Sequence, residues 1–327
     1  MDAASRASVP SNLDNGPVRL IRPLIAALGA AAIPAVAVAH GPVAEAPTLP
    51  GVLADWSLQP VPLAGLVLAA VGYLALVRTV AVRHPRNVPK RWRTAAFLAG
   101  LAAIALALLS PIERYEGSLF SVHMVQHLLL EMVAAPLLLL GAPITLLLRA
   151  ARPGPRRALL RVLHSVPLRV LAFPLVAWLL FAAVNWGWHF STLYDEALEN
   201  QALHYLQHAT FLGAALLFWW PVIGADPSPW RLPQPVRLFY LFLAMPQNSF
   251  LGVAIMSAGS VLYPHYLTNQ RAWGPSPLDD QALGGILMWV VGDIAFLVGM
   301  AVVVAMWVRS EDRRTARLDA RLDAEGR

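Results

Sequence analysis

Three ionisable side chains recur at intervals of four residues within one apolar stretch, residues 118–143. They are His123, His127 and Glu131. A spacing of four places side chains one turn apart on the same helix face. The stretch is long enough to cross a bilayer, where an ionisable group costs about 2.5–3.5 kcal/mol on insertion scales. These three residues are therefore candidates for function, and imidazole is the commonest metal ligand.

A second pair with the same spacing, His204 and His208, lies on another apolar stretch. Nine histidines in 327 residues give about 0.2 such pairs by chance, whereas this chain has two. His189 and His265 follow the outer ends of two further stretches, and Asp280 opens the last one together with Gln281. The sequence therefore predicts one shared metal site with these candidate ligands: His123, His127, His189, His204, His208, His265, Asp280, Gln281, Met124 and Glu131.

Copper is the leading candidate for the metal. The chain has no cysteine, which excludes disulfides, thiolate metal sites and iron–sulfur clusters. Imidazole suits zinc, copper, iron and nickel, and a thioether such as that of Met124 shifts the preference toward Cu(I). Zinc is the second candidate, and haem held by two histidines is the third. No HExxH motif, nucleophile with a base, or phosphate-binding glycine loop is present, so we expect no catalysis.

The elements that must carry these residues are membrane helices. The chain is 57% hydrophobic and 13% charged, whereas soluble domains have about 25% charged residues. We predict an all-α, polytopic bundle in which residues 1–39 are a signal peptide or an additional helix, 40–308 a seven-helix membrane domain, and 309–327 a cytoplasmic tail. The seven expected spans are Val61–Val80, Thr94–Leu109, Leu119–Leu140, Val170–Trp186, Ala202–Trp220, Leu238–Ile255 and Leu283–Val308.

Basic residues predict the orientation of these helices. Of the 25 lysines and arginines, 23 lie on alternate loops and termini, and only Arg114 and Arg271 lie on the other set. The side rich in basic residues is cytoplasmic, so we expect the C-terminus inside and both histidine pairs in the outer half of the membrane. The net charge of +6 therefore reflects the orientation of the chain in the membrane and does not indicate nucleic-acid binding.

Two other functions remain open at this stage. Glu131, Gln247, Asn248 and Asp293 could line the path of an inward cation transporter, with Pro246 interrupting its helix beside two of them. Alternatively, histidines from facing helices could hold haem b in a membrane oxidoreductase. Cleavage after residue 39 would also make His40 a terminal copper chelator.

Three motifs resemble the multi-span CtaG family of cytochrome c oxidase assembly factors. They are HMVQHLLLEMVAAPLLLLGAP, WHFSTLYDEALENQALHYLQHATFLGAALLFWWPV and LDDQALGGILMW, and the resemblance covers roughly residues 55–308. It implies a bacterial plasma-membrane protein of respiratory chain biogenesis that helps copper reach a haem–copper oxidase. The implied partners are oxidase subunits, a periplasmic copper chaperone and membrane lipid. Its motifs place His123, His127, His189, His204, His208, Asp280 and Gln281 in the site, whereas His265 rests on the predicted topology alone.

Overall fold

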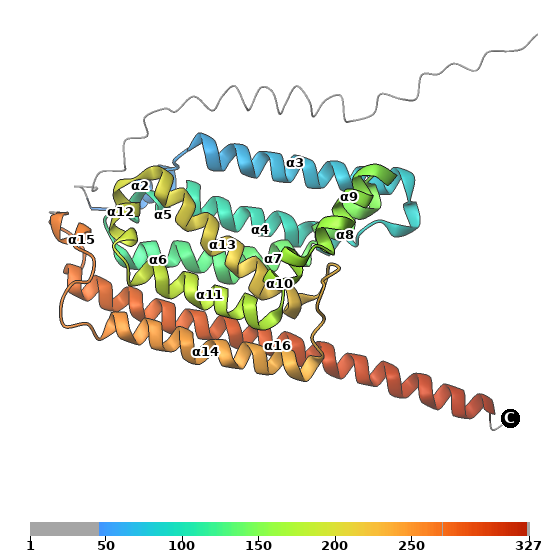
Figure 1. The fold of residues 1–327 in the computed structure, drawn as a ribbon. Coiled ribbons are helices and arrows are strands. Elements are labelled where there is room, and N and C mark those ends of the chain that lie inside the picture. Colours follow the sequence, from blue (N-terminus) through green and yellow to red (C-terminus); the bar gives the residue numbers. More distant parts are fainter. Residues whose placement is uncertain (1–45, 270, 326–327) are drawn as a thin grey trace, which may run out of the picture. The chain divides into compact units, whose positions relative to one another are not determined.

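The computed structural model describes residues 46–269 and 271–325, which belong to one compact unit, Val38–Arg327. Every regular element in these ranges is helical (Figure 1). In chain order they are α2 (Leu49–Ala54), α3 (Pro60–Arg83), the 3₁₀ turn η1 (Pro85–Asn87), α4 (Arg91–Leu109), α5 (Pro111–Tyr115), α6 (Phe120–Leu128), the π turn η2 (Leu129–Ala134), α7 (Ala135–Leu140), α8 (Pro143–Ala150), α9 (Pro153–Leu163), α10 (Val166–Leu171), α11 (Pro174–His189), α12 (Leu193–Glu199), α13 (Gln201–Ile223), α14 (Gln234–Met256), α15 (His265–Thr268) and α16 (Pro277–Glu325). The expected signal peptide or first helix, residues 1–39, and His40 lie outside the described residues.

Six helical segments among the described residues are long and apolar enough to cross a membrane, so the chain is a membrane protein. They are Pro60–Arg83, Arg91–Tyr115, Phe120–Ala150, Gln201–Ile223, Gln234–Met256 and Pro277–Ala324. The seventh expected span, Val170–Trp186, is divided between α10 and α11, because Pro174 begins a new helix after Phe173. The 16 residues of α11 rise about 24 Å, less than the roughly 30 Å of a hydrocarbon core. The count of seven is therefore not confirmed.

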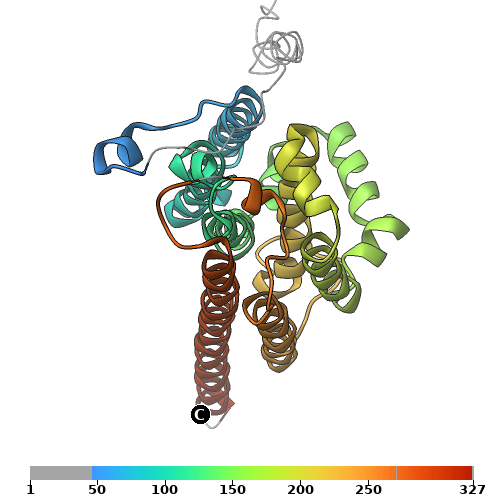
Figure 2. The same cartoon turned by 90° about the vertical axis from the view of Figure 1, so that its left-hand side faces the viewer.

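The long helices run alongside one another, and the short helices α2, α5, α12 and α15 gather at one end of the bundle (Figure 1). Figure 2 views the bundle from that end. Helix α6 begins at this end, α13 begins there too, and α11 finishes there, so all three bring a histidine-bearing terminus to the same place. The remainder of the core is apolar and aromatic, with Phe181, Phe218, Trp219 and Phe296 packed together.

A π turn interrupts the helix that carries the first histidine pair. The N–H of Ala135 donates to the carbonyl of Leu130, five residues earlier. The next bond of this pattern would run from residue 136 to Glu131, but Pro136 has no N–H. The indole Nε1 of Trp219 donates to this carbonyl instead, at 3.0 Å. The proline thus explains why the helix widens at Glu131, and π turns of this kind are frequent at functional sites.

Close contact between α14 and α16 holds the C-terminal part of the bundle together. A Cβ on Gly252 would lie 2.7 Å from the carbonyl oxygen of Gly285, and one on Gly285 would lie 2.6 Å from the carbonyl oxygen of Gly252. Small residues allow membrane helices to approach at this distance. Helix α16 also packs along α6 and thereby supports the helix that carries His123.

Candidate metal centre

Five buried histidines from three helices lie together at the end of the bundle where the short helices gather. We call them the histidine cluster: His123 and His127 from α6, His204 and His208 from α13, and His189 at the end of α11. Each is at most 5% exposed. Neighbouring ring centroids are 4.2 Å apart for His204 and His208, and 4.3 Å apart for His123 and His127. The two pairs are in contact with each other, with ring centroids 5.5 Å apart for His123 and His204, and His189 joins them at 6.0 Å from His127.

Within the cluster, three histidines could share one metal ion. His123, His204 and His208 each offer a ring nitrogen, and the three nitrogens lie within 4.8 Å of one another. We call these residues the three-histidine group. His127 adjoins the group, because its Nε2 is 2.9 Å from the Nε2 of His123. Nitrogen donors without thiolate suit zinc, copper, iron or nickel, so this geometry is compatible with metal binding and leaves the identity of the metal open.

The carboxylate of Glu116 sets the orientation of His123. Its Oε2 is 2.9 Å from Nδ1 of His123 and 3.8 Å from Nε2 of His204. A carboxylate accepts hydrogen bonds, so the Nδ1–H of His123 donates to it and Nε2 keeps its lone pair. Tyr266 donates from its hydroxyl to the carbonyl of Glu116, and burial raises the pKa of Tyr266 well above its ordinary value, which keeps the phenol protonated. Carboxylate–histidine pairs of this kind hold metal-binding imidazoles in place.

The side-chain amide of Gln126 sets the orientation of His208. Its Nε2 donates to Oε2 of Glu113 at 2.5 Å and to the carbonyl of Ala107 at 2.9 Å. Both amide hydrogens are then used, so Oε1 must accept from Nε2–H of His208, at 3.1 Å. Nδ1 of His208 consequently retains the lone pair. Gln59 extends this network by donating to Oε1 of Glu113 at 2.7 Å.

Deeper in the bundle, Asn185 connects the end of α11 with the π turn. Its carbonyl oxygen lies 2.7 Å from Nδ1 of His189, and its side-chain Nδ2 donates to Oε1 of Glu131 at 3.0 Å. Glu131 is 3% exposed and therefore faces the bundle interior, on the same helix as His127. The expected stack of His123, His127 and Glu131 on one face is thus present, and Glu131 contacts the cluster through an amide.

Residues 71–310 match the family model described as cytochrome c oxidase caa3 assembly factor, Caa3_CtaG. The chain belongs to this family. The matched segment contains all five residues of the histidine cluster. The resemblance inferred from the three sequence motifs is therefore confirmed.

Mycobacterial proteins are similar to this member of the Caa3_CtaG family over most of its length. Uncharacterized proteins of Mycobacterium bovis and Mycobacterium tuberculosis are each 33% identical over 289 residues, which are 86% of this chain and 43% of the relative. An uncharacterized protein of Mycobacterium leprae is 32% identical over 266 residues, 79% of this chain and 40% of the relative. The chain thus spans about two fifths of the length of these relatives. No solved structure matches it.

Asp280 and Gln281, two residues of the third family motif, form hydrogen bonds with backbone groups of neighbouring segments. Asp280 accepts from the N–H of Phe120 at 2.7 Å and from the hydroxyl of Ser121 at 2.5 Å, so it caps the first turn of α6. Gln281 accepts from the N–H of Leu262 and donates to the carbonyls of Ile255 and Ser260. Their assignment as metal ligands stays a prediction, and the contacts in the structure give both residues another role in the Caa3_CtaG fold.

His265 begins α15 and lies apart from the three-histidine group. Its Nε2 is 3.1 Å from the carbonyl oxygen of Gly117, and its backbone N–H donates to Oδ1 of Asp195 at 3.2 Å. Burial raises the pKa of Asp195, and the hydrogen bond from His265 opposes this shift. His265 thus ties the loop before α16 to α12, and its role as a ligand stays a prediction.

Sequence reasoning missed the polar residues that orient the histidines. Glu113 and Glu116 precede α6 in the segment ERYEGS, and both are at most 4% exposed. Gln126 directly precedes His127 in HMVQH and is fully buried. The sequence does show two carboxylates within ten residues of a histidine-bearing helix, and this proximity could have indicated that they contact the histidines.

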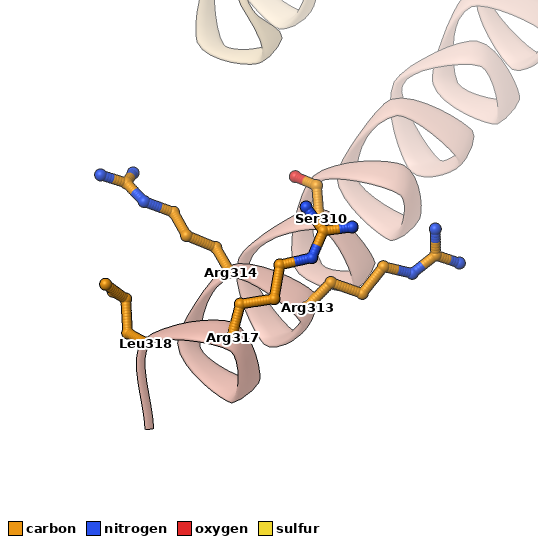
Figure 3. A pocket seen from close by; sticks show the side chains of 5 residues that line it. All are labelled: Ser310, Arg313, Arg314, Arg317 and Leu318. Atoms are coloured by element: carbon orange, nitrogen blue, oxygen red, sulfur yellow. The ribbon is translucent and has the colours of Figure 1, made fainter. Parts of the chain in front are cut away.

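The residues expected along a transport path do not form one group. Asn248 donates to Oδ1 of Asp293 at 3.3 Å, and Ser249 donates to Oδ2 at 2.7 Å, so these bonds hold α14 and α16 together. Gln247 accepts from the indole of Trp186 on α11, and Glu131 lies in the π turn. A surface hollow of about 420 Å³ lies elsewhere, on the tail part of α16, and is lined by Ser310, Arg313, Arg314, Arg317 and Leu318 (Figure 3).

Proposed function

We propose that this chain assists the assembly of a haem–copper cytochrome c oxidase by holding copper in the histidine cluster and passing it to an oxidase subunit. In this proposal copper is a cargo, received from a periplasmic chaperone at the outer side of the membrane. The observation that carries the proposal is the convergence of five buried histidines, three of which are oriented by hydrogen bonds that they donate to residues behind them. The chain belongs to an assembly-factor family, and for this reason we propose an oxidase as the recipient of the copper.

The chemistry of the cluster favours delivery of an ion over the other two functions. Neutral imidazoles compensate a monovalent cation with little buried charge, and Glu116 supplies one negative group beside it. Neighbouring imidazoles are in ring contact and Phe211 packs against His127 at 4.3 Å, so the interior of the cluster has no space for a porphyrin, which disfavours haem. Transport is disfavoured because the core beyond Glu131 is filled by large apolar side chains such as Phe218 and Phe296.

The direct test is the copper content and Cu(I) affinity of the purified protein. We expect about one copper per chain or more in the native protein, and a loss of at least about tenfold in affinity when two ligands are removed by His204→Asn with His208→Asn. The matched control is His84→Asn with His164→Asn, because both of these histidines are exposed on loops between helices. Circular dichroism and gel filtration verify that each variant is folded.

The same two double variants test the biological role. In a strain that lacks the chain, we expect the native protein and the His84→Asn/His164→Asn variant to restore oxidase activity and oxidase-bound copper. The His204→Asn/His208→Asn variant should restore neither, although it is present in the membrane in equal amount. Full restoration by that variant would contradict a role for the cluster in delivery and would leave a scaffolding role in assembly.

A further inference from the structure

The sulfur of Met124 lies 3.4 Å from Nε2 of His189, next to the three-histidine group but not part of it. Both side chains are buried: Met124 is fully buried and His189 is 3% exposed. Met124 follows His123 on α6, so the two side chains point about 100° apart around the helix. The sulfur therefore lies on a different side of α6 from the imidazole of His123.

Hydrogen bonding shows which atoms face each other in this contact. The carbonyl oxygen of Asn185 lies 2.7 Å from Nδ1 of His189, and a carbonyl can only accept, so Nδ1 carries the proton. A neutral imidazole has one N–H, so Nε2 presents a lone pair to the sulfur. A doubly protonated ring would bury a charge that, among the described residues, no carboxylate pairs with. Two lone-pair atoms thus face each other between buried side chains, an arrangement that a cation between them would stabilise.

The separation of the Met124 sulfur and Nε2 of His189 is compatible with one metal ion bound to both atoms. With a metal–nitrogen bond of about 2.0 Å and a metal–sulfur bond of about 2.3 Å, a separation of 3.4 Å corresponds to an angle of about 100° at the metal. This value is close to tetrahedral or trigonal coordination. Packing alone requires an apolar group at position 124, but it does not require that the sulfur be aligned with the lone pair of an imidazole.

His127 can supply a third ligand. Its ring centroid lies 6.0 Å from that of His189, and its Nδ1 has no hydrogen-bond partner among the described residues although the residue is 4% exposed. When Nε2 of His123 is not bound to an ion in the three-histidine group, its lone pair accepts from Nε2–H of His127 across 2.9 Å. Nδ1 of His127 is then a buried acceptor without a donor, which is unfavourable unless a cation binds it.

We propose that Met124, His189 and His127 form a thioether-containing subsite that binds Cu(I), adjacent to the three-histidine group. The inference rests on the proposed function and specifies the oxidation state of the cargo. A thioether is a soft ligand, and a site with one sulfur and two imidazoles selects Cu(I) over zinc and over Cu(II). The three-histidine group offers nitrogen ligands alone, which suit zinc, copper, iron or nickel.

X-ray absorption at the copper edge tests the subsite in the full-length protein, loaded with Cu(I) under anaerobic reducing conditions. The chain has no cysteine, so any copper–sulfur scattering must come from methionine. We expect one sulfur at about 2.3 Å, lost in Met124→Leu, which conserves side-chain volume. The matched control is Met288→Leu, a buried methionine of the same apolar group as Met124. Its sulfur signal should equal that of the native protein.

The outcomes separate the subsite from the proposed function. A sulfur shell that is lost in Met124→Leu and kept in Met288→Leu, with a roughly 10- to 100-fold weaker Cu(I) affinity in the former, supports the subsite. Copper bound by nitrogen alone in the native protein overturns the subsite and leaves delivery by the histidines intact. A native protein that binds no copper overturns both. The native spectrum decides whether sulfur is a ligand, and the leucine variants assign that sulfur to one methionine. A sulfur shell that is kept in a folded Met124→Leu protein also overturns the subsite.

Discussion

Each imidazole has two nitrogens, and the partner of one nitrogen determines what the other can bind. In the histidine cluster two of these partners are Glu116 and Gln126. Glu116 accepts a hydrogen bond from Nδ1–H of His123, whereas Gln126 accepts one from Nε2–H of His208. The two histidines therefore keep their lone pairs on different ring nitrogens. It follows that changes to these partners should weaken metal binding without removing a ligand.

Replacing Glu116 with glutamine tests this dependence. The amide has nearly the same shape but no charge, and its NH₂ group can face Nδ1 of His123, which would reverse the ring's tautomer. We expect the affinity for Cu(I) to fall roughly 10- to 100-fold, as is typical when a partner behind a metal ligand is lost. Competition with a chromophoric Cu(I) chelator measures the change.

The control for this variant is Glu196→Gln, which makes the same substitution at an exposed residue of α12. Its affinity should equal that of the native protein. If Glu116→Gln also binds as tightly as the native protein, the carboxylate does not orient His123, and the contact at 2.9 Å is only a packing arrangement.

Helix α6 is positioned at its first turn by a residue from the far end of the sequence. Asp280, at the start of α16, accepts from the backbone N–H of Phe120 and from the hydroxyl of Ser121. A carboxylate at a helix N-terminus satisfies donors that have no partner within the helix and interacts favourably with the helix dipole. The acidic residue of the third family motif can thus be understood as a cap that fixes the helix bearing His123 and His127.

Replacing Asp280 with alanine distinguishes a cap from a ligand. We expect the free energy of unfolding to fall by about 0.5–2 kcal/mol, the usual cost of a lost cap, and the copper content per folded chain to stay unchanged. Thermal unfolding in detergent and metal analysis measure the two quantities. Asp279→Ala is the control, because Asp279 is exposed and bonds only locally, to Ser276. A loss of copper at unchanged stability would instead make Asp280 a ligand.

The sequence predicted features that depend on local periodicity and missed those that depend on contacts between helices. Four-residue spacing correctly grouped His123 with His127 and His204 with His208, because helical geometry alone puts such pairs on one face. The approach of Glu116 to both pairs follows from how α5, α6 and α13 pack, which no local pattern encodes.

Proline accounts for the differences in helix boundaries. Apolar length predicted a continuous span over Val170–Trp186, but Pro174 separates α10 from α11 and leaves α11 short. At Pro136 the structure has a π turn, in which the indole of Trp219 donates to the carbonyl that the proline leaves without a donor. The proline accounts for the widened turn, but the partner that satisfies Glu131 lies 88 positions further along the chain and could not be predicted from the local sequence.

For the chain as a whole, delivery to an oxidase depends on which side of the membrane the histidine cluster faces. The cluster lies at the end of the bundle where α6 and α13 begin, and the basic loops around α9 and the arginines of the α16 tail lie beyond the opposite ends of these helices. The asymmetry of 23 basic residues against 2 predicts that the arginine-rich end is cytoplasmic. The cluster would then lie near the outer face, the side at which we propose that copper is received.

Single cysteine substitutions can test this orientation without background, because the chain contains no cysteine of its own. We expect a membrane-impermeant maleimide to label Glu199→Cys in intact cells, since Glu199 is exposed at the end of α12, near the histidine cluster. Arg156→Cys in α9 and Arg317→Cys in the tail should react only after the membrane is permeabilised. All three positions are exposed, so differences in labelling report the side of the membrane rather than burial. The reverse pattern would place the cluster at the cytoplasmic face, where it could not pass copper to a site assembled outside, and the delivery proposal would have to be abandoned even if the histidines bind copper.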